Sequence, residues 1–285
     1  ISLRNVEWLA VTLFFLQQIL LIQFLIRRFF VFRRMPFPGI VFLPIGFLQS
    51  LLGIFLFFRT NERDLFLLFA GEAFLVNLIF GLGSKMIPVI SRIPGSLTPA
   101  ESGQKESFVL PFVTAALVNI GYLAELTNAP MLPLGIRLVG FVLAAIFLLR
   151  LFSAPTRWTA VGIGLKVSVV LFLFGQVGIA LLPDYRLSIL HLSYVGGLFL
   201  VTVMVSVRVI LAHGSQPLSY EVSSPRILSI VGFVVVATIL RLFAQVELSN
   251  PFLLSSIVFM IASMVLWAHK FYSCLTGQEE IGRAS

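Results

Sequence analysis

Few residues in this sequence have side chains that could do chemistry, and the three histidines stand out among them. They are His191, His213 and His269. His191 and His213 are separated by about 22 positions, which is about 33 Å along a helix that rises about 1.5 Å per residue. One metal ion or one haem therefore cannot take both as ligands. His269 is expected on the same side of the molecule as His213 and could meet it.

His191 is the best candidate ligand of the three. The segment that begins with it, HLSYVGGLF, contains small residues that would leave space beside the imidazole. Axial ligation by histidine is one way in which proteins hold haem. Gly196 and Gly197 are consistent either with room for a flat cofactor or with close helix packing. For each histidine the competing interpretation is a structural or interfacial role.

A single acid, Glu72, lies near the centre of the apolar segment LFLLFAGEAFLVNLIFGLG. A lone carboxylate at that depth costs several kcal/mol unless it is paired or protonated, so it must face the bundle or water. One interpretation is a proton relay, or an acid that contacts a cofactor. The other is a protonated glutamate that forms a hydrogen bond between helices.

Other polar side chains also lie in apolar segments. Arg137 and Lys166 are a turn or two from the predicted ends of their helices, where long side chains snorkel to the interface, and we expect both to do so. Arg208 and Arg241 are harder to explain in that way. Most amides in the spans are expected to form hydrogen bonds between helices. They are Gln17, Gln18, Gln49, Asn77, Asn119 and Gln176.

The elements that must position these residues are membrane spans. Apolar residues make up 59% of the 285 positions and charged residues 11%, and the mean hydropathy is +1.04. A soluble domain needs roughly a quarter charged residues to cover its surface. The net charge is +8, and the basic residues behind it flank the apolar runs. We therefore expect these residues to set the membrane topology and not to bind nucleic acid. A single cysteine, Cys274, excludes an internal disulfide and a multi-cysteine metal site within one chain.

The sequence predicts an all-α polytopic transmembrane helical bundle that forms one domain over residues 1–285. Continuously apolar runs longer than barrel strands favour helices over a membrane barrel. A tight turn is expected at 59–64, and a surface loop rich in proline and glycine at 84–107. About nine spans are expected, at roughly 8–26, 39–58, 65–83, 108–126, 132–152, 159–182, 187–212, 226–245 and 250–273.

Lysine and arginine are concentrated on one side of this arrangement. The odd-numbered loops, counted from the first, and the C-terminal tail carry most of them. By the positive-inside rule the C-terminus is cytoplasmic and the N-terminus lies outside. An outside N-terminus without a signal peptide, in a chain that begins with Ile1, leads us to expect further residues before it.

The segment 191–218, HLSYVGGLFLVTVMVSVRVILAHGSQPL, resembles the NnrS family of bacterial haem- and copper-containing membrane proteins linked to nitric oxide metabolism. That family has a histidine that opens a span, a glycine-rich helix, an arginine near its end and a His-Thr-Gly-Arg-Pro-Leu turn. Here Gly-Ser-Gln stands in place of Thr-Gly-Arg. Lys85 in GLGSKMIPVIS and Arg241 in ATILRLFA are similar to two further basic positions of the family. The matching positions of the first segment are His191, Gly196, Gly197, Arg208, His213, Pro217 and Leu218.

The resemblance implies a bacterial inner-membrane protein that binds haem or copper and acts in nitric oxide response or metabolism. The family has about twelve spans and an N-terminal His-x-His-Glu motif that this sequence lacks, so part of the cofactor site is expected outside this chain. Metal would be held by His191, His213 and His269. The residues expected to contact the cofactor are His191, His213, Arg208, Glu72 and Arg241.

Two other functions remain open at this stage. One is a proton-coupled transporter of a small solute, with Glu72 and Arg137 lining its pathway. The other is an accessory subunit of a membrane respiratory complex. Besides the lipid bilayer, the partners expected are respiratory or denitrification components. A Walker-type loop, a GxGxxG turn and an H-E-x-x-H motif are missing from the sequence, which argues against an ATP-driven or dinucleotide enzyme. Whether the chain catalyses a reaction is not decided by these patterns.

Overall fold

A computed structural model describes the backbone of residues 3–32, 37–94, 107–127, 131–182, 185–213, 222, 224–246 and 250–275. Within those residues the secondary structure is helical and contains no strand, so the all-α prediction is confirmed. Every predicted span is a helix or an unbroken series of helical segments. Seven helices are long and apolar enough to cross a membrane, while Val109–Ala124 and Leu132–Leu148 are apolar but shorter.

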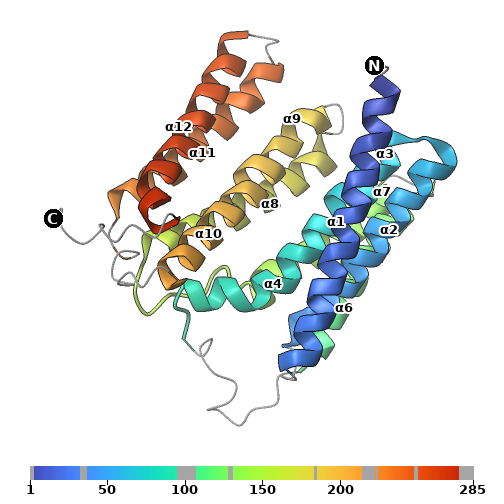
Figure 1. Cartoon of the computed structure of the whole chain (residues 1–285), viewed down its shortest axis with the longest axis horizontal. Helices are drawn as coiled ribbons and strands as arrows, with labels where there is room; N and C mark the ends of the chain where they lie inside the picture. The colour runs from blue at the N-terminus through green and yellow to red at the C-terminus, as the bar shows by residue number, and fades with distance from the viewer. Residues whose placement is uncertain are drawn as a thin grey trace. The chain divides into compact units, whose positions relative to one another are not determined.

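The chain forms two compact units, Ile1–Lys85 with Gln104–Ala144 and Met86–Gly103 with Ala145–Ser285. Figure 1 labels their helices. The first unit contains α1 (Leu3–Phe32), η1 (Pro38–Val41), α2 (Phe42–Thr60), α3 (Arg63–Phe66), η2 (Leu67–Ala73), most of α4 (Phe74–Ile90), α6 (Val109–Ala124) and α7 (Met131–Leu143). The second contains most of η3 (Ala144–Leu148), then α8 (Ala160–Leu181), α9 (Arg186–His191), η5 (Leu192–Phe199), α10 (Leu200–His213), α11 (Pro225–Val246) and α12 (Asn250–Leu275).

Glycines bring helices into close contact in the first unit. A Cβ added to Gly46 of α2 would lie 2.7 Å from the Cβ of Asn77 in α4. One added to Gly121 of α6 would lie 2.7 Å from the Cβ of Arg137 and 2.9 Å from its backbone nitrogen. Real Cβ atoms do not approach so closely, so these positions need glycine. Small residues of this kind are how membrane helices pack against one another.

The second unit uses the same device where α8 meets η5. A Cβ at Gly175 would lie 2.8 Å from the backbone nitrogen of Ser193, and one at Gly197 would lie 2.8 Å from the Cβ of Phe172. Further along the chain, α11 and α12 pack against each other over most of their length. The hydroxyl of Ser256 donates a 2.8 Å hydrogen bond from α12 to a carbonyl of α11.

The third span is longer than predicted. The expected loop at 84–107 is wrong at its start, because α4 continues through Pro88 to Ile90. It ends in a left-handed cap at Arg92, with φ 53°. The amide of Ile93 bonds the carbonyl of Pro88 at 3.0 Å, and that of Arg92 bonds the carbonyl of Val89 at 3.1 Å. This pair of bonds satisfies the last carbonyls of a helix and explains where α4 stops. Residues 95–106 of the expected loop lie outside the described residues.

Among the described residues, three segments have π-helical hydrogen bonding: η2, η3 and η5. Such segments are rare and are frequently found at functional sites. Glu72 lies inside η2, and His191 directly precedes η5. The two residues that the sequence marks most strongly therefore lie at irregular points in their helices.

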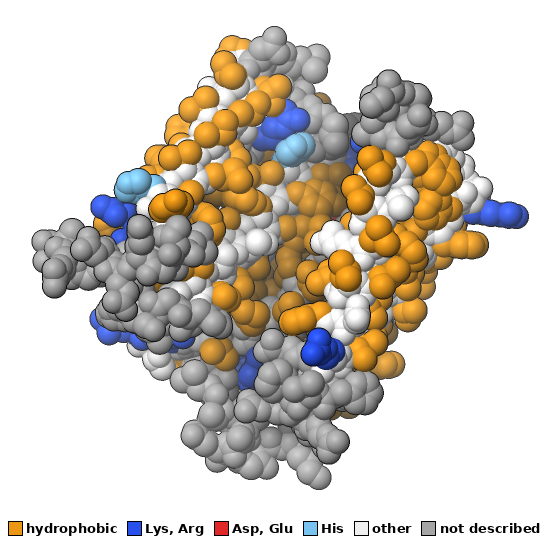
Figure 2. Space-filling model, in the orientation of Figure 1, with side chains coloured by type: hydrophobic (Ala, Val, Ile, Leu, Met, Phe, Trp, Pro, Cys, Tyr) orange, Lys and Arg blue, Asp and Glu red, His pale blue; other side chains and the backbone are white. Residues whose placement is uncertain are grey.

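Hydrophobic side chains are exposed along the outer helices, as a lipid-facing surface requires. Figure 2 shows them along α1 and α12. They include Leu13 and Leu20 on α1 and Leu254 and Val258 on α12. The exposure agrees with a chain whose outer surface faces lipid.

Candidate functional site

Glu72 is buried in the first unit, with 5% of its side chain exposed. It belongs to η2, and its carboxylate oxygen accepts a 3.1 Å hydrogen bond from the hydroxyl of Tyr122 in α6. Tyr122 is itself fully buried. The prediction that Glu72 faces the bundle is therefore confirmed, and its partner comes from another helix.

Arg137 is buried as well, and the expectation that it snorkels to the interface is wrong. Its side chain is 1% exposed, and its Nη1 donates a hydrogen bond to the carboxylate of Glu125. The same nitrogen lies 3.8 Å from a carboxylate oxygen of Glu72. The guanidinium also lies over the ring of Tyr122, 4.5 Å from its centroid. Because its backbone is held against Gly121, Arg137 reaches these acids instead of the interface.

Two members of this cluster, Tyr122 and Glu125, were not predicted from the sequence. Glu125 directly follows α6 and is 13% exposed. The available signal was the short connection between two apolar helices, with an acid at the end of the first and an arginine early in the second. Antiparallel neighbours joined in this way bring such positions together. We call Glu72, Tyr122, Glu125 and Arg137 the acid–arginine cluster.

The charges of the acid–arginine cluster do not balance. Two carboxylates share one guanidinium, so the ionised cluster would carry a net charge of about −1 in a low-dielectric site. Arg137 forms a hydrogen bond with Glu125 and lies within ion-pair distance of Glu72, 3.8 Å away. One nitrogen of Arg137, Nη2, is buried without a hydrogen-bond partner among the described residues.

An amide pair continues the polar contacts between α4 and α6. Asn77 and Asn119 donate to each other's side-chain oxygens at 2.8 and 2.9 Å. Gln49 of α2 donates to the carbonyl of Asn119 at 3.5 Å. In the second unit, Gln176 donates to the hydroxyl of Ser193 at 3.1 Å. The prediction of bonds between helices is confirmed for these four amides.

The same prediction is not confirmed for two amides of α1. Gln17 is exposed, and the amide atoms of Gln18 are buried without a partner among the described residues.

Lys166 was expected to snorkel towards the interface, and it reaches the connection before its own helix. Its ammonium donates a 2.6 Å hydrogen bond to the carbonyl of Ser153, and it lies 5.2 Å from the ring centroid of Trp158.

In the second unit, His191 is paired with Arg241. The Nε–H of Arg241 donates to Nε2 of His191 at 3.1 Å, and both side chains are partly buried. The structure thus brings together two of the residues expected at a cofactor. However, the imidazole nitrogen that would bind a metal already accepts a hydrogen bond.

The space expected beside His191 is filled by neighbouring helices. A Cβ at Gly196 would lie 2.9 Å from Leu171, and one at Gly197 would meet the backbone Cα of Phe172 at 3.1 Å. The packing interpretation of these glycines is therefore the correct one. With Nε2 bonded to Arg241, the side chains as they stand do not form a preformed haem pocket at His191.

The other predicted ligands do not gather around His191. His191 and His213 lie at opposite ends of the helical series α9–η5–α10. The side chain of His213 lies outside the described residues, His269 is exposed on α12, and Arg208 is partly buried on α10. Among the described residues, no three His, Cys, Asp or Glu side chains form a group that could hold a metal ion.

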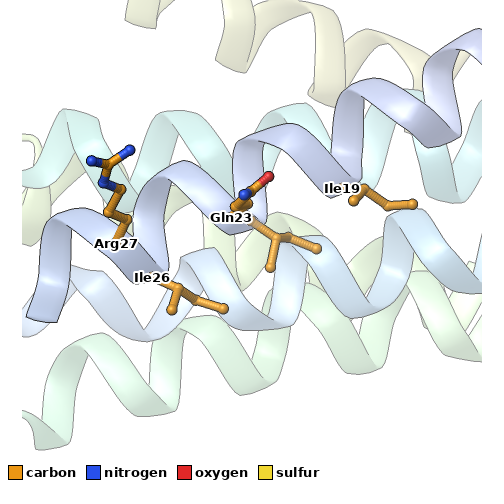
Figure 3. A pocket seen from close by; sticks show the side chains of 5 residues that line it. Ile19, Gln23, Ile26 and Arg27 are labelled. Atoms are coloured by element: carbon orange, nitrogen blue, oxygen red, sulfur yellow. The ribbon is translucent and has the colours of Figure 1, made fainter.

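A hollow on the surface of α1 does not add a candidate. It is lined by Ile19, Ile22, Gln23, Ile26 and Arg27, all from one helix. In Figure 3, Gln23 and Arg27 point to one side of the helix and Ile26 to the other. Residues of a single helix that point to different sides do not converge on a ligand, so the acid–arginine cluster remains the best candidate site.

A family model described as NnrS protein matches residues 2–278, well beyond the segment in which the motifs are dense. Neither a curated protein nor a solved structure matches the chain.

Proposed function

Because the chain belongs to the NnrS family, we propose that it is a bacterial inner-membrane protein that acts in the response to nitric oxide or in its metabolism. The seven helices long and apolar enough to cross a membrane support a multi-pass membrane protein. The lysine and arginine bias supports a cytoplasmic C-terminus. Respiratory or denitrification proteins are its proposed partners.

The site that carries this proposal is the acid–arginine cluster, with Glu72 as an acid that holds and exchanges one proton. The supporting observation is that a buried carboxylate, Glu72, and a partly buried one, Glu125, both lie within ion-pair distance of the guanidinium of Arg137. Intramembrane acids are costly to retain and mark proton relays in many membrane proteins. Tyr122 orients the carboxyl group of Glu72 through its hydroxyl.

The experiment is complementation of a strain that lacks the gene, challenged with a nitric oxide donor. Wild-type protein restores survival, whereas Glu72→Gln leaves the strain as sensitive as the deletion because an amide cannot exchange the proton. The matched control is Glu62→Gln, which changes an exposed glutamate near the start of the same span. Full survival with Glu72→Gln, at equal protein levels in the membrane, would remove Glu72 from the function.

Haem or copper binding stays a prediction that the family resemblance supports. Ligation of haem by His191 requires Arg241 to release Nε2, since the hydrogen bond between them occupies that nitrogen. Purified protein would then show a Soret band that His191→Ala removes and that Arg241→Ala leaves in place. Absence of both the band and bound metal in protein purified from membranes would refute the cofactor prediction and leave the proposal for Glu72 intact.

A proton-coupled transporter of a small solute is the second candidate. It is favoured by the distance of 3.8 Å between Arg137 and Glu72, the two residues expected to line a pathway. Proteoliposomes separate the candidates. Solute-dependent proton uptake that Glu72→Gln abolishes would favour transport, whereas unchanged lumenal pH with every tested solute would favour the first candidate.

A further inference from the structure

Two connections of the second unit are bonded to each other at one end of its helices. They are the turn that ends α4, residues 91–94, and the segment before α8, residues 149–159. The carbonyl of Arg92 accepts hydrogen bonds from the amide of Thr156 at 2.9 Å and from its hydroxyl at 3.0 Å. Nη1 of Arg150 donates to the carbonyl of Pro94 at 3.0 Å. These bonds bring Arg92 and Arg150 onto one surface of the unit.

Both of these arginines have a backbone conformation that favours glycine. The φ angle is 53° at Arg92 and 50° at Arg150. Glycine adopts this left-handed conformation without strain, whereas the Cβ of a larger residue comes too close to the following carbonyl oxygen. Arginine at these two positions therefore strains the backbone, and its cation is the property that glycine would lack.

The positive charge of this end has no acid beside it in the described part of the second unit. Those residues include neither aspartate nor glutamate, and the acids in the same range of sequence lie outside the described residues. Such an excess of one sign attracts anions to the surface that carries it. The described cations of the unit on its predicted cytoplasmic side are Arg92, Arg150, Arg157, Lys166, Arg208, Arg226 and Lys270.

Exposed aromatic rings lie on the same connection as the cations. Phe152 is 79% exposed and Trp158 is 58% exposed. The ammonium of Lys166 lies 5.2 Å from the ring centroid of Trp158. Rings beside cations are typical of the level of lipid headgroups, where the ring enters the apolar region and the cation meets phosphate. We call this patch the basic surface, and it consists of Arg92, Arg150, Phe152, Arg157, Trp158 and Lys166.

The guanidinium groups of the basic surface are available to a ligand. Arg92 is half-buried and Arg157 is exposed, and the guanidinium of neither forms a hydrogen bond or an ion pair with the described residues. Arg92 joins the two connections through its backbone carbonyl, so its side chain is not needed for that contact. Arg150 uses only Nη1 in its bond to Pro94.

We propose that the basic surface binds the phosphate headgroup of an anionic phospholipid. According to the predicted topology this end of the unit is cytoplasmic, and clusters of basic residues at that level bind anionic headgroups. The exposed rings favour a lipid over a soluble anion, because a soluble anion offers nothing apolar for Phe152 and Trp158 to enter. The inference goes beyond the proposed function and uses no residue of the acid–arginine cluster.

Native mass spectrometry of the purified full-length protein in a neutral detergent tests the proposal, with phosphatidylglycerol as the anionic probe and phosphatidylcholine as its zwitterionic counterpart. Wild-type protein should bind phosphatidylglycerol more tightly. The double variant Arg92→Gln/Arg157→Gln should weaken that binding about 30-fold, because two cations are removed. The matched control is Arg59→Gln, which removes an exposed arginine on the predicted outer side and should leave the affinity unchanged.

Arg92→Gly separates lost binding from misfolding. Glycine relieves the strain at φ 53°, so the lipid-free variant should unfold at a higher temperature than wild type. It should nevertheless bind phosphatidylglycerol about fivefold more weakly, since one cation is gone. A merely damaged protein would lose stability together with lipid binding.

Three results would overturn the proposal. Equal affinity of wild-type protein for the two lipids would mean that the cations are already neutralised within the full chain. An Arg59→Gln variant as weak as the double variant would mean that diffuse charge, and not the basic surface, attracts the lipid. Stabilisation against thermal unfolding by inorganic phosphate equal to that by phosphatidylglycerol would assign the site to a free anion.

Discussion

At the scale of single residues, the buried cation of Arg137 lies within ion-pair distance of two acids, Glu72 and Glu125. The sequence identified Glu72, since a lone acid in an apolar segment is conspicuous. It misassigned Arg137, because its nearness to a predicted helix end suggested snorkelling. The true reason for its position is a contact with Glu125 from the preceding helix. Such a partner cannot be recognised from one span considered alone.

Removal of Arg137 should strongly destabilise the first unit. Arg137→Gln removes the guanidinium that pairs with Glu72 and Glu125, and breaking a buried pair in this way costs about 3–5 kcal/mol. The control is Arg63→Gln, which removes an arginine with 69% of its side chain exposed and should cost less than about 1 kcal/mol. Unfolding in mixed micelles measures both. Equal stability of the two variants would mean that the buried pair contributes nothing.

At the scale of elements, the nine predicted spans were recognisable as apolar runs, and helices occupy all of them, seven of which are long and apolar enough to cross a membrane. The π segments η2 and η5 were not, since no side-chain pattern distinguishes them from α-helix. The extension of α4 was missed because Pro88 suggested a loop. Pro88 removes one i→i−4 hydrogen bond of α4, yet the helix continues two residues beyond it to Ile90.

Substitution by alanine should destabilise the protein at one glycine, Gly121 of α6, and have no effect at another, Gly135 of α7. Gly121→Ala places a methyl group 2.7 Å from the Cβ of Arg137, so α6 and α7 must separate at a cost of about 1–3 kcal/mol. Gly135→Ala in α7 meets no atom within 4 Å and should be neutral. Unfolding measurements compare the two. A neutral Gly121→Ala would show that α6 and α7 do not pack at this point.

At the scale of the whole molecule, hydrogen bonds agree with the predicted topology. The turn after α4 and the segment before α8 were both assigned to the cytoplasmic side. Thr156 donates to the carbonyl of Arg92 through its amide at 2.9 Å and through its hydroxyl at 3.0 Å. Arg150 donates to the carbonyl of Pro94 at 3.0 Å. Two segments assigned to opposite sides of a membrane could not form these bonds.

Cysteine labelling tests that topology directly. In a Cys274→Ser background, Asn61→Cys and Ala154→Cys place single thiols at exposed positions of two connections. A membrane-impermeant maleimide should label Asn61→Cys in intact spheroplasts and Ala154→Cys only after permeabilisation. The reverse pattern would invert the orientation, and labelling of both in intact spheroplasts would mean that the span count between them is wrong.

We propose that Glu72 holds an exchangeable proton inside the first unit. Infrared difference spectroscopy of the purified protein, recorded on exchange of H2O for D2O, measures that proton without assuming a substrate or a cofactor. We expect a protonated-carboxyl band that shifts on deuteration in wild-type protein and is absent in Glu72→Gln. Identical spectra for the two proteins would contradict the proposal.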